Sequence, residues 1–419
     1  MFSITTSELP STISILRNAK KPLLILGTYG IGKSEMIFQS AVADAEAKGR
    51  KFIDWNRSSN AEKAEAMKDP SSYYIFVDIR ISQLDEGDLR GIPVIGTVDA
   101  AKDNELKLVT LGWINYITKA GAAGTVFFDE LNLARPSVTA SAYSIINDKV
   151  ISDRSISPEV FIVAAGNNTE DCDLVQPIAE PLMDRFAMAQ LILDKKYWLE
   201  WAAKNINPYL YAFCNWDSSM IHKPAKAGSE DKAITPRGIY NASCILDNVD
   251  FSNKREVHKA IAICVGEAFA TKFLAYYEHV RAIDWSSLKE DPSCVANFDT
   301  EKQFAVMGAA VAKIKEVAES TSSSAVDFLS STKLFLQVLA NLPTDFIMAA
   351  IKQLVALKPN YGSAKVDDAQ LSIANLIGKI MLMGAKAFNT KKKLPASDLA
   401  TLESLQAWFK PHVKIFTRL

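Results

Sequence analysis

Apolar and polar positions alternate in blocks along the first half of the chain. Five short runs are almost continuously apolar, as is typical of strands buried on both faces of a parallel sheet. Between them lie longer stretches with helical spacing, such as Lys33–Lys48, which is closed by Gly49. The pattern predicts a doubly wound α/β domain with a five-stranded parallel sheet over residues 1–194. The predicted strands are Pro22–Leu26, Tyr73–Ile79, Thr125–Phe128, Val160–Ala165 and Phe186–Leu193.

An unusual segment separates the second and third of these runs. Two short β-prone stretches, Ile92–Val98 and Leu106–Leu111, flank the polar segment Asp99–Glu105. We interpret residues 92–111 as a β-hairpin that projects from the domain. An irregular surface loop is the alternative.

The pattern changes after Asp194, where helical spacing replaces strand signals. Residues 195–283 contain three stretches of this kind, and we expect them to form a helical lid domain: Tyr197–Asn205, Pro236–Leu246 and Glu256–Val280. Residues 284–419 again have helical spacing and are predicted to be a helical C-terminal extension. Breaks are expected there at Ser320–Ser324, Pro343 and Lys358–Ser363.

Composition adds limits rather than a function. The 419 residues carry a formal net charge of −1, which gives no sign of nucleic-acid binding, although a local basic groove remains possible. The five cysteines are far apart and form no C-x-x-C pair, so we expect reduced thiols rather than zinc sites or disulfides. No secretory signal and no apolar run of membrane-spanning length is present. These features favour a soluble cytoplasmic protein without membrane contact.

The first chemical signal lies directly after the first predicted strand. Residues 27–34 read G-T-Y-G-I-G-K-S and fit the P-loop pattern G-x-x-x-x-G-K-[ST]. Glycines let the backbone curl around phosphate oxygens, and the following helix directs its positive end at the same anion. Lys33 is expected to reach the β- and γ-phosphates of ATP, and Ser34 to ligate Mg²⁺. The predicted nucleotide-binding residues are Gly27, Thr28, Tyr29, Gly30, Ile31, Gly32, Lys33 and Ser34.

The second signal ends the third predicted strand, 96 residues after Lys33, where the sequence reads T-V-F-F-D-E. Acids at this position lie at the carboxyl edge of a parallel sheet, where ligands of such folds bind. Asp129 is expected to hold Mg²⁺ together with Ser34, and Glu130 to polarise the attacking water. The two motifs together predict an ATPase.

Several further segments resemble one family, in both order and spacing. The resemblance is to AAA+ ATPases of the MoxR and dynein/midasin-related branch, and it covers roughly residues 20–280. It rests on Asp129–Pro136 (Walker B), Val163–Asn167 (sensor 1), Pro181–Phe186 (arginine finger), Thr235–Arg237 (sensor 2), Asp78–Pro93 and Trp198–Ala202. The hairpin would then be the helix-2 insert of that clade.

The resemblance implies roles for three more residues. Asn167 would hydrogen-bond the γ-phosphate or the attacking water, unless it only turns the chain. Arg185 would reach into a neighbouring subunit's site, unless it forms a surface ion pair with Asp184 or Glu180. Arg237 would contact the γ-phosphate and couple nucleotide state to the lid, unless it is an ordinary exposed arginine after a proline.

Two departures from the family pattern stand out. Tyr29 occupies a loop position where the family often has proline, although the essential glycines, lysine and serine are kept. Arg135 comes two residues after Leu133 and three after Asn132, whereas MoxR proteins commonly have arginine directly after the asparagine. A second basic finger from this helix is therefore not supported.

The family also implies partners. A finger acting in trans requires an oligomer, and the relatives usually form hexameric rings that remodel proteins like chaperones, often beside a separate protein with a von Willebrand factor A domain. Three other functions stay open: a nucleic-acid motor or loader, a small-molecule kinase or GTPase, and a nucleotide-gated scaffold with slow hydrolysis. The kinase or GTPase reading gives Arg185 and Arg237 no use, and no N/T-K-x-D motif is present.

Overall fold

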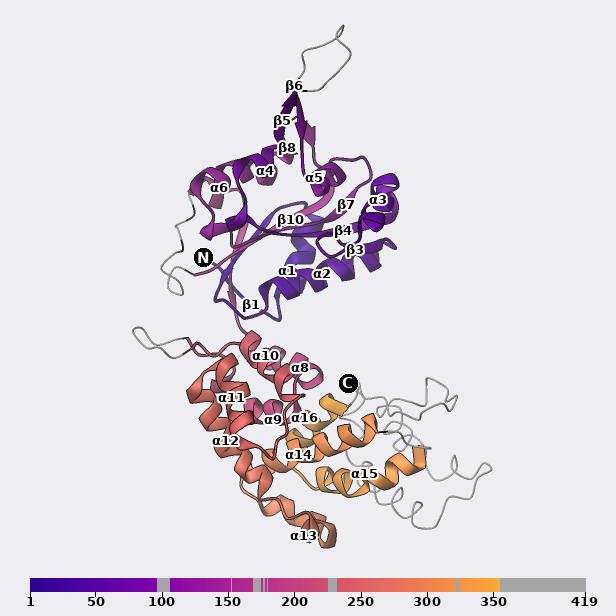
Figure 1. The fold of residues 1–419 in the computed structure, drawn as a ribbon, viewed down its shortest axis with the longest axis vertical. Coiled ribbons are helices and arrows are strands. Elements are labelled where there is room, and N and C mark those ends of the chain that lie inside the picture. Colours follow the sequence, from indigo (N-terminus) through magenta and orange to yellow (C-terminus); the bar gives the residue numbers. More distant parts are fainter. Residues whose placement is uncertain are drawn as a thin grey trace, which may run out of the picture. The chain divides into compact units, whose positions relative to one another are not determined.

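The computed structural model describes residues 1–95, 106–151, 153–168, 175, 178, 180–224, 232–320 and 325–354. The chain divides into two compact units, Met1–Asp194 and Lys195–Leu419. Figure 1 shows the α/β composition of the first and the helical composition of the second.

The first unit is built on a seven-stranded sheet in which every strand is parallel to its neighbours. The strand order is β1-β11-β2-β10-β7-β4-β3. The strands are β1 (Ser3–Thr5), β2 (Leu23–Gly27), β3 (Lys51–Asp54), β4 (Tyr73–Arg80), β7 (Ala123–Asp129), β10 (Glu159–Gly166) and β11 (Ala187–Ile192). All five predicted strands are present. The sequence pattern missed β1 and β3, because these short edge strands contain one and two apolar residues.

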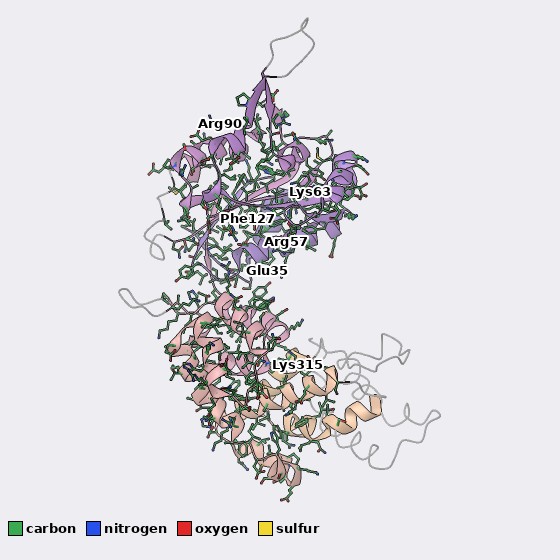
Figure 2. All side chains as sticks on the ribbon, viewed as in Figure 1. Glu35, Arg57, Lys63, Arg90, Phe127 and Lys315 are labelled. Carbon is green, nitrogen blue, oxygen red and sulfur yellow. The ribbon has the colours of Figure 1, made fainter. Side chains whose placement is uncertain are left out.

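Helices cover both faces of this sheet. The sequence of β7 is continuously apolar because its side chains are buried on both faces. Phe127 lies in one core with α1 and α2, whereas Val126 and Phe128 lie in the other core with α3, α5 and α6. Figure 2 shows Phe127 inside this unit. The helices are α1 (Leu9–Asn18), α2 (Lys33–Ala47), α3 (Asn60–Lys68), α4 (Glu86–Arg90), α5 (Gly112–Ile117), α6 (Pro136–Tyr143) and α7 (Glu180–Met183). A parallel sheet with helices on both faces and a glycine-rich loop between β2 and α2 is a P-loop NTPase core, so the predicted fold class is confirmed.

Two hairpins lie outside the main sheet. β5 (Ile92–Ile95) pairs antiparallel with β6 (Leu106–Val109) and projects from the unit (Figure 1), and β8 (Val150–Ile151) pairs with β9 (Arg154–Ser155). The Arg154 guanidinium donates to Asn115 Oδ1 of α5 and to Thr110 Oγ1 just after β6, both at 2.7 Å. One arginine therefore fastens the base of the projecting hairpin to α5 and to β9. Residues 96–105, between β5 and β6, lie outside the described residues.

The second unit is helical throughout its described residues, apart from an isolated bridge between Lys223 and Ile234. Its helices are α8 (Lys195–Asn205), α9 (Pro208–Trp216), α10 (Pro236–Leu246), α11 (Lys254–Val265), α12 (Glu267–Arg281), α13 (Trp285–Glu290), α14 (Thr300–Glu319), α15 (Ala325–Ala340) and α16 (Thr344–Leu354). The stretch predicted as helical over Glu256–Val280 is two helices rather than one. Gly266 separates them with a φ of +107°, a conformation that side chains with a Cβ rarely adopt.

Aromatic side chains fill the core of this unit. Phe213 of α9 contacts Phe269, Phe273 and Tyr276 of α12 with ring centroids 5.1–5.6 Å apart. On α14, a Cβ at Gly308 would lie 2.8 Å from the Ala212 Cβ, so the glycine allows α14 and α9 to pack closely. Because this contact joins the two predicted parts of the unit, a division into a lid over 195–283 and an extension over 284–419 stays a prediction.

The structure also bears on the cysteines and on membrane-spanning helices. Cys214, Cys244, Cys264 and Cys294 are free thiols, and Cys172 lies outside the described residues. None of the described helices is both long enough and apolar enough to cross a membrane.

Candidate active site

The loop that joins β2 to α2 has the backbone form that the sequence predicted for phosphate binding. Gly30 and Gly32 have φ values of +75° and +95°, which favour glycine. Gly32 is also the N-cap of α2, and no side chain caps this helix end. The N-terminus of α2 therefore carries no competing side-chain cap, and the helix dipole favours negative charge there. At Gly27 a Cβ would lie 2.9 Å from the Leu191 carbonyl oxygen, so this glycine lets the loop start tightly against β11.

Lys33 begins α2 and is buried, with 7% of its surface exposed. Its Nζ donates to the carbonyl oxygens of Gly27 at 2.5 Å and Thr28 at 3.1 Å, and to Asn167 Oδ1 at 3.2 Å. The Lys33 side chain thus bends back toward the phosphate loop, and its ammonium group binds the loop's own carbonyl oxygens. Tyr29, at the top of the same loop, is 38% exposed.

Ser34 and Asp129 meet beside this loop. Ser34 Oγ donates to Asp129 Oδ2 at 3.0 Å, and the other Asp129 oxygen accepts from the Glu130 backbone N–H at 2.9 Å. Both side chains offer oxygen donors, the kind that Mg²⁺ prefers, and a serine–aspartate pair leaves room for the waters and phosphate oxygens that Mg²⁺ usually keeps. Within the described residues, no group of three or more His, Cys, Asp or Glu is arranged to hold a metal. The donor set therefore fits Mg²⁺ bound with a nucleotide rather than an all-protein metal site.

Glu130 has a strained backbone and a fixed side chain. Its φ of +57° lies in the left-handed region, which is uncommon for residues other than glycine and is enriched at functional sites. Its Oε2 accepts from Ser82 Oγ at 2.7 Å. Ser82 lies in the short 3₁₀ turn Ile81–Gln83 that follows β4. Sequence reasoning missed Ser82, since a single serine 48 residues before Glu130 gives no signal of its own.

The strand order brings Asn167 to the same place. β10 lies between β2 and β7, so the residue after β10 falls between the phosphate loop and Asp129. Asn167 Oδ1 accepts from Lys33 there, and its backbone bonds to Asn132 in the 3₁₀ turn Leu131–Leu133.

Asp78 adds a further acid to this edge of the sheet. Burial, and then the negative charge of Asp129, raise the pKa of Asp78 to about 6, although Arg80 opposes the rise. Its Oδ1 has no hydrogen-bond partner among the described residues. The charged form of Asp78 is therefore poorly compensated in the nucleotide-free protein.

Arg185 lies away from the site of its own chain. It is exposed and comes two residues before β11, at the amino end of that strand. Ala187 is level with Leu23, and Leu191 is level with Gly27. At about 3.3 Å per residue, these four steps alone place the start of β11 roughly 13 Å from the edge that carries the phosphate loop.

Arg237 belongs to the second unit, where it is the second residue of α10 and exposed. Pro236 begins the helix, and the Thr235 side chain caps it by accepting from the Gly238 N–H at 3.1 Å. The structure thus brings together Lys33, Ser34, Asp129, Glu130 and Asn167. It does not bring Arg185 to this edge of the sheet, and Arg237 stands in a separate unit.

Comparisons with known proteins give structural likeness alone. No protein-family model matches this sequence, and no curated protein matches it. The chain is similar to NtrX from Brucella abortus (14% identity, TM-score 0.30, 76% of this chain), spanning 65% of the length of that structure. It is similar to the Aeropyrum pernix ORC2 protein in ADPNP–ADP complexes (9% identity, TM-score 0.33, 82% of this chain and 91% of that one). It is also similar to the Thermotoga maritima RuvB Holliday junction branch migration motor (13% identity, TM-score 0.27, 82% and 87%). At these TM-scores the site itself, rather than the likeness, carries the functional argument.

Proposed function

We propose that this chain binds ATP with Mg²⁺ and hydrolyses it as a subunit of a ring-forming AAA+ ATPase. The observation that carries the proposal is the meeting of Lys33, Asp129 and Asn167 at one edge of the sheet. Lys33 begins the helix after β2, Asp129 ends β7 and Asn167 follows β10, so the three come from segments far apart in sequence. A phosphate loop alone would indicate nucleotide binding. A carboxylate pair and an amide beside the position of the γ-phosphate favour hydrolysis.

Each residue has a defined task in this proposal. The loop N–H groups and Lys33 would bind and orient the phosphates, and Lys33 would exchange its bonds to neutral carbonyl oxygens for phosphate oxygens. Glu130 would orient the attacking water and take its proton. Asn167 would hold the γ-phosphate or the water. Ser34 and Asp129 would hold Mg²⁺, which offsets the negative charge of the phosphates.

The position of Arg185 supports assembly. Its place at the amino end of β11 argues against a role at the site of its own chain, and it is exposed. An arginine supplied by a neighbouring subunit can stabilise the charge of the transferred phosphoryl group, so we propose that Arg185 acts in trans in a closed ring, expected to be a hexamer. Arg237 would contact the γ-phosphate from the helical unit.

The biological task proposed here is remodelling of a protein or complex, in the manner of MoxR-type ATPases that work with a separate partner, such as a von Willebrand factor A-domain protein. The support for it is the resemblance of the sequence motifs together with the anchored β5–β6 hairpin. Such a hairpin can transmit changes at the site to a bound protein because its base is fastened at two points.

The decisive experiment measures ATP turnover by size-separated full-length protein. We expect turnover only in oligomeric fractions, with losses of about 10²–10⁴-fold for Glu130→Gln and about 10³-fold for Arg185→Ala. Arg57→Ala is the matched control, because Arg57 is an arginine of the same unit with an 86% exposed side chain.

Mixing the two inactive variants tests action in trans. A Glu130→Gln subunit keeps its finger, and an Arg185→Ala subunit keeps its base. Random mixing should therefore rebuild active sites at roughly a quarter of the interfaces. Fully active monomers, or no recovery on mixing, would contradict the ring and the trans finger but leave the phosphate site intact.

A further inference from the structure

A buried asparagine connects two parts of the site. Asn132 Nδ2 donates to the Asn167 carbonyl oxygen at 2.7 Å, and Asn132 Oδ1 accepts from the Asn167 N–H at 3.0 Å. One side-chain amide thus engages both backbone polar groups of Asn167. Asn132 is 5% exposed, so water competes little for these bonds.

The neighbouring backbone is shaped for this contact. A Cβ at Gly166 would lie 2.7 Å from Asn132 Oδ1 and 2.8 Å from Leu26 Cδ2. Any larger residue would push against the amide. The close approach of Asn132 to the end of β10 therefore depends on the missing side chain of Gly166.

The bonds occur where regular pairing has stopped. The β10–β7 ladder ends at the pair Ala164–Phe128. Beyond it, Glu130 turns into the left-handed region and the chain enters the turn Leu131–Leu133. No β10–β7 hydrogen bonds join the segment after β10 to the segment after β7 at this point. The two hydrogen bonds of Asn132 therefore hold Asn167 in place relative to that turn.

Glu130 comes directly before this turn, two residues before Asn132. The Asn167 side chain in turn contacts Lys33. We propose that Asn132 is a positioning residue for the ATP hydrolysis proposed above. It sets the distance between Glu130, which would orient the attacking water and take its proton, and Asn167, which would hydrogen-bond the γ-phosphate or the water. It does so without touching the substrate.

The test compares kcat with ATP affinity in the full-length protein. Asn132→Ala should lower kcat about 10–100-fold, the range expected when reacting groups shift by about 1 Å. The Kd for ATP with Mg²⁺ should change by less than about threefold, because the phosphate loop is unaltered. Gly166→Ala should lower kcat in the same direction, since it displaces the amide while Asn132 itself is kept.

A double-mutant cycle separates positioning from plain stabilisation. If Asn132 acts through Asn167, Asn132→Ala should lower kcat much less when Asn167 is already alanine than in the wild-type background. Thr125→Val is the matched control. Thr125 lies on the same strand as Asp129, and this change removes the buried hydrogen bond between Thr125 Oγ1 and the Tyr74 hydroxyl. It should leave kcat unchanged. Should Asn132→Ala fail to fold, Asn132→Ser, which keeps a short hydrogen-bonding group, replaces it in the same cycle.

The outcomes distinguish this inference from the proposed function. If the wild type shows no ATP turnover, the proposed function is wrong. If the wild type is active but Asn132→Ala keeps its kcat, or its effect adds fully to that of Asn167→Ala, the positioning role is wrong and ATP hydrolysis stands.

Discussion

Two clusters of polar side chains in the first unit differ in how their charges are matched. The helix-side cluster comprises Arg17, Asp44, Lys48 and Glu159; the site cluster comprises Lys33, Ser34, Asp129 and Asn167. In the helix-side cluster, opposite charges pair: Arg17 with Asp44 at 3.4 Å, and Lys48 with Asp44 at 3.2 Å and Glu159 at 3.3 Å. In the site cluster, the bonds described above pair a charged group with a neutral one.

The difference follows from where each cluster lies. Arg17 lies in the last turn of α1, Asp44 lies in α2, Lys48 is the C-cap residue of α2, and Glu159 begins β10; Arg17 also stacks over Phe161 at 5.2 Å. Fixed elements with matched charges stabilise the fold. The site residues lie at the carboxyl edge of the sheet, around a phosphate loop whose Gly30 and Gly32 have positive φ and next to Glu130, which also has positive φ. Charge–neutral bonds are replaced by phosphate or Mg²⁺ at little cost, so this second pattern is the one suited to binding.

The largest expected effect comes from removing the cation of the site cluster. Lys33→Ala should lower ATP turnover about 10²–10³-fold or more, because the charge facing the developing negative charge is lost. The free energy of unfolding should change by about 1–3 kcal/mol, because charged hydrogen bonds to Gly27, Thr28 and Asn167 are lost while the cost of burying the ammonium is removed as well. Turnover assays and urea denaturation measure the two quantities. Lys48→Ala in the helix-side cluster is the control and should leave turnover within about twofold.

The opposite result is expected for Arg17. Arg17→Ala should lower the free energy of unfolding by about 2–4 kcal/mol, because it leaves Asp44 buried with only part of its compensation, and turnover should be unaffected. Urea denaturation at pH 7 measures this change. Replacing both partners, as Arg17→Met with Asp44→Leu, should recover most of the loss. A double variant as unstable as Arg17→Ala would show that packing, rather than charge matching, dominates there.

The smallest effect is expected for Asp78 and depends on pH. Since its folded pKa of about 6 lies above that of an unfolded aspartate, near 4, the group favours the folded state at low pH. This contribution is lost as pH rises from about 4 to 6. Asp78→Asn should therefore stabilise the nucleotide-free, Mg²⁺-free protein by about 1 kcal/mol at pH 7, after allowance for solvent screening, and by nearly nothing below pH 4. Thermal unfolding across this pH range measures the difference, and a gap that does not vary with pH would argue against the assigned cause.

Much of the fold was predictable because its signals are local. Buried strands such as Val160–Ala165 are continuously apolar, and α10 begins at Pro236 as its sequence indicates. The edge strands β1 and β3 were missed because they are too short and polar to form an apolar run. The break at Gly266 was missed because one glycine in a helical stretch does not by itself end a helix.

The sequence by itself determined the parts whose chemistry is contiguous: the phosphate loop Gly27–Ser34 and the acids that end β7. Their residue types and spacing fix the local backbone, so neighbours along the chain suffice. Only the tertiary structure decided that β10 lies between β2 and β7, and hence that Asn167 contacts Lys33. It also decided the bonds of Ser82 to Glu130 and of Asn132 to Asn167, which join residues 48 and 35 positions apart. Strand order is set by the packing of whole faces, and such contacts leave no periodic trace in the sequence.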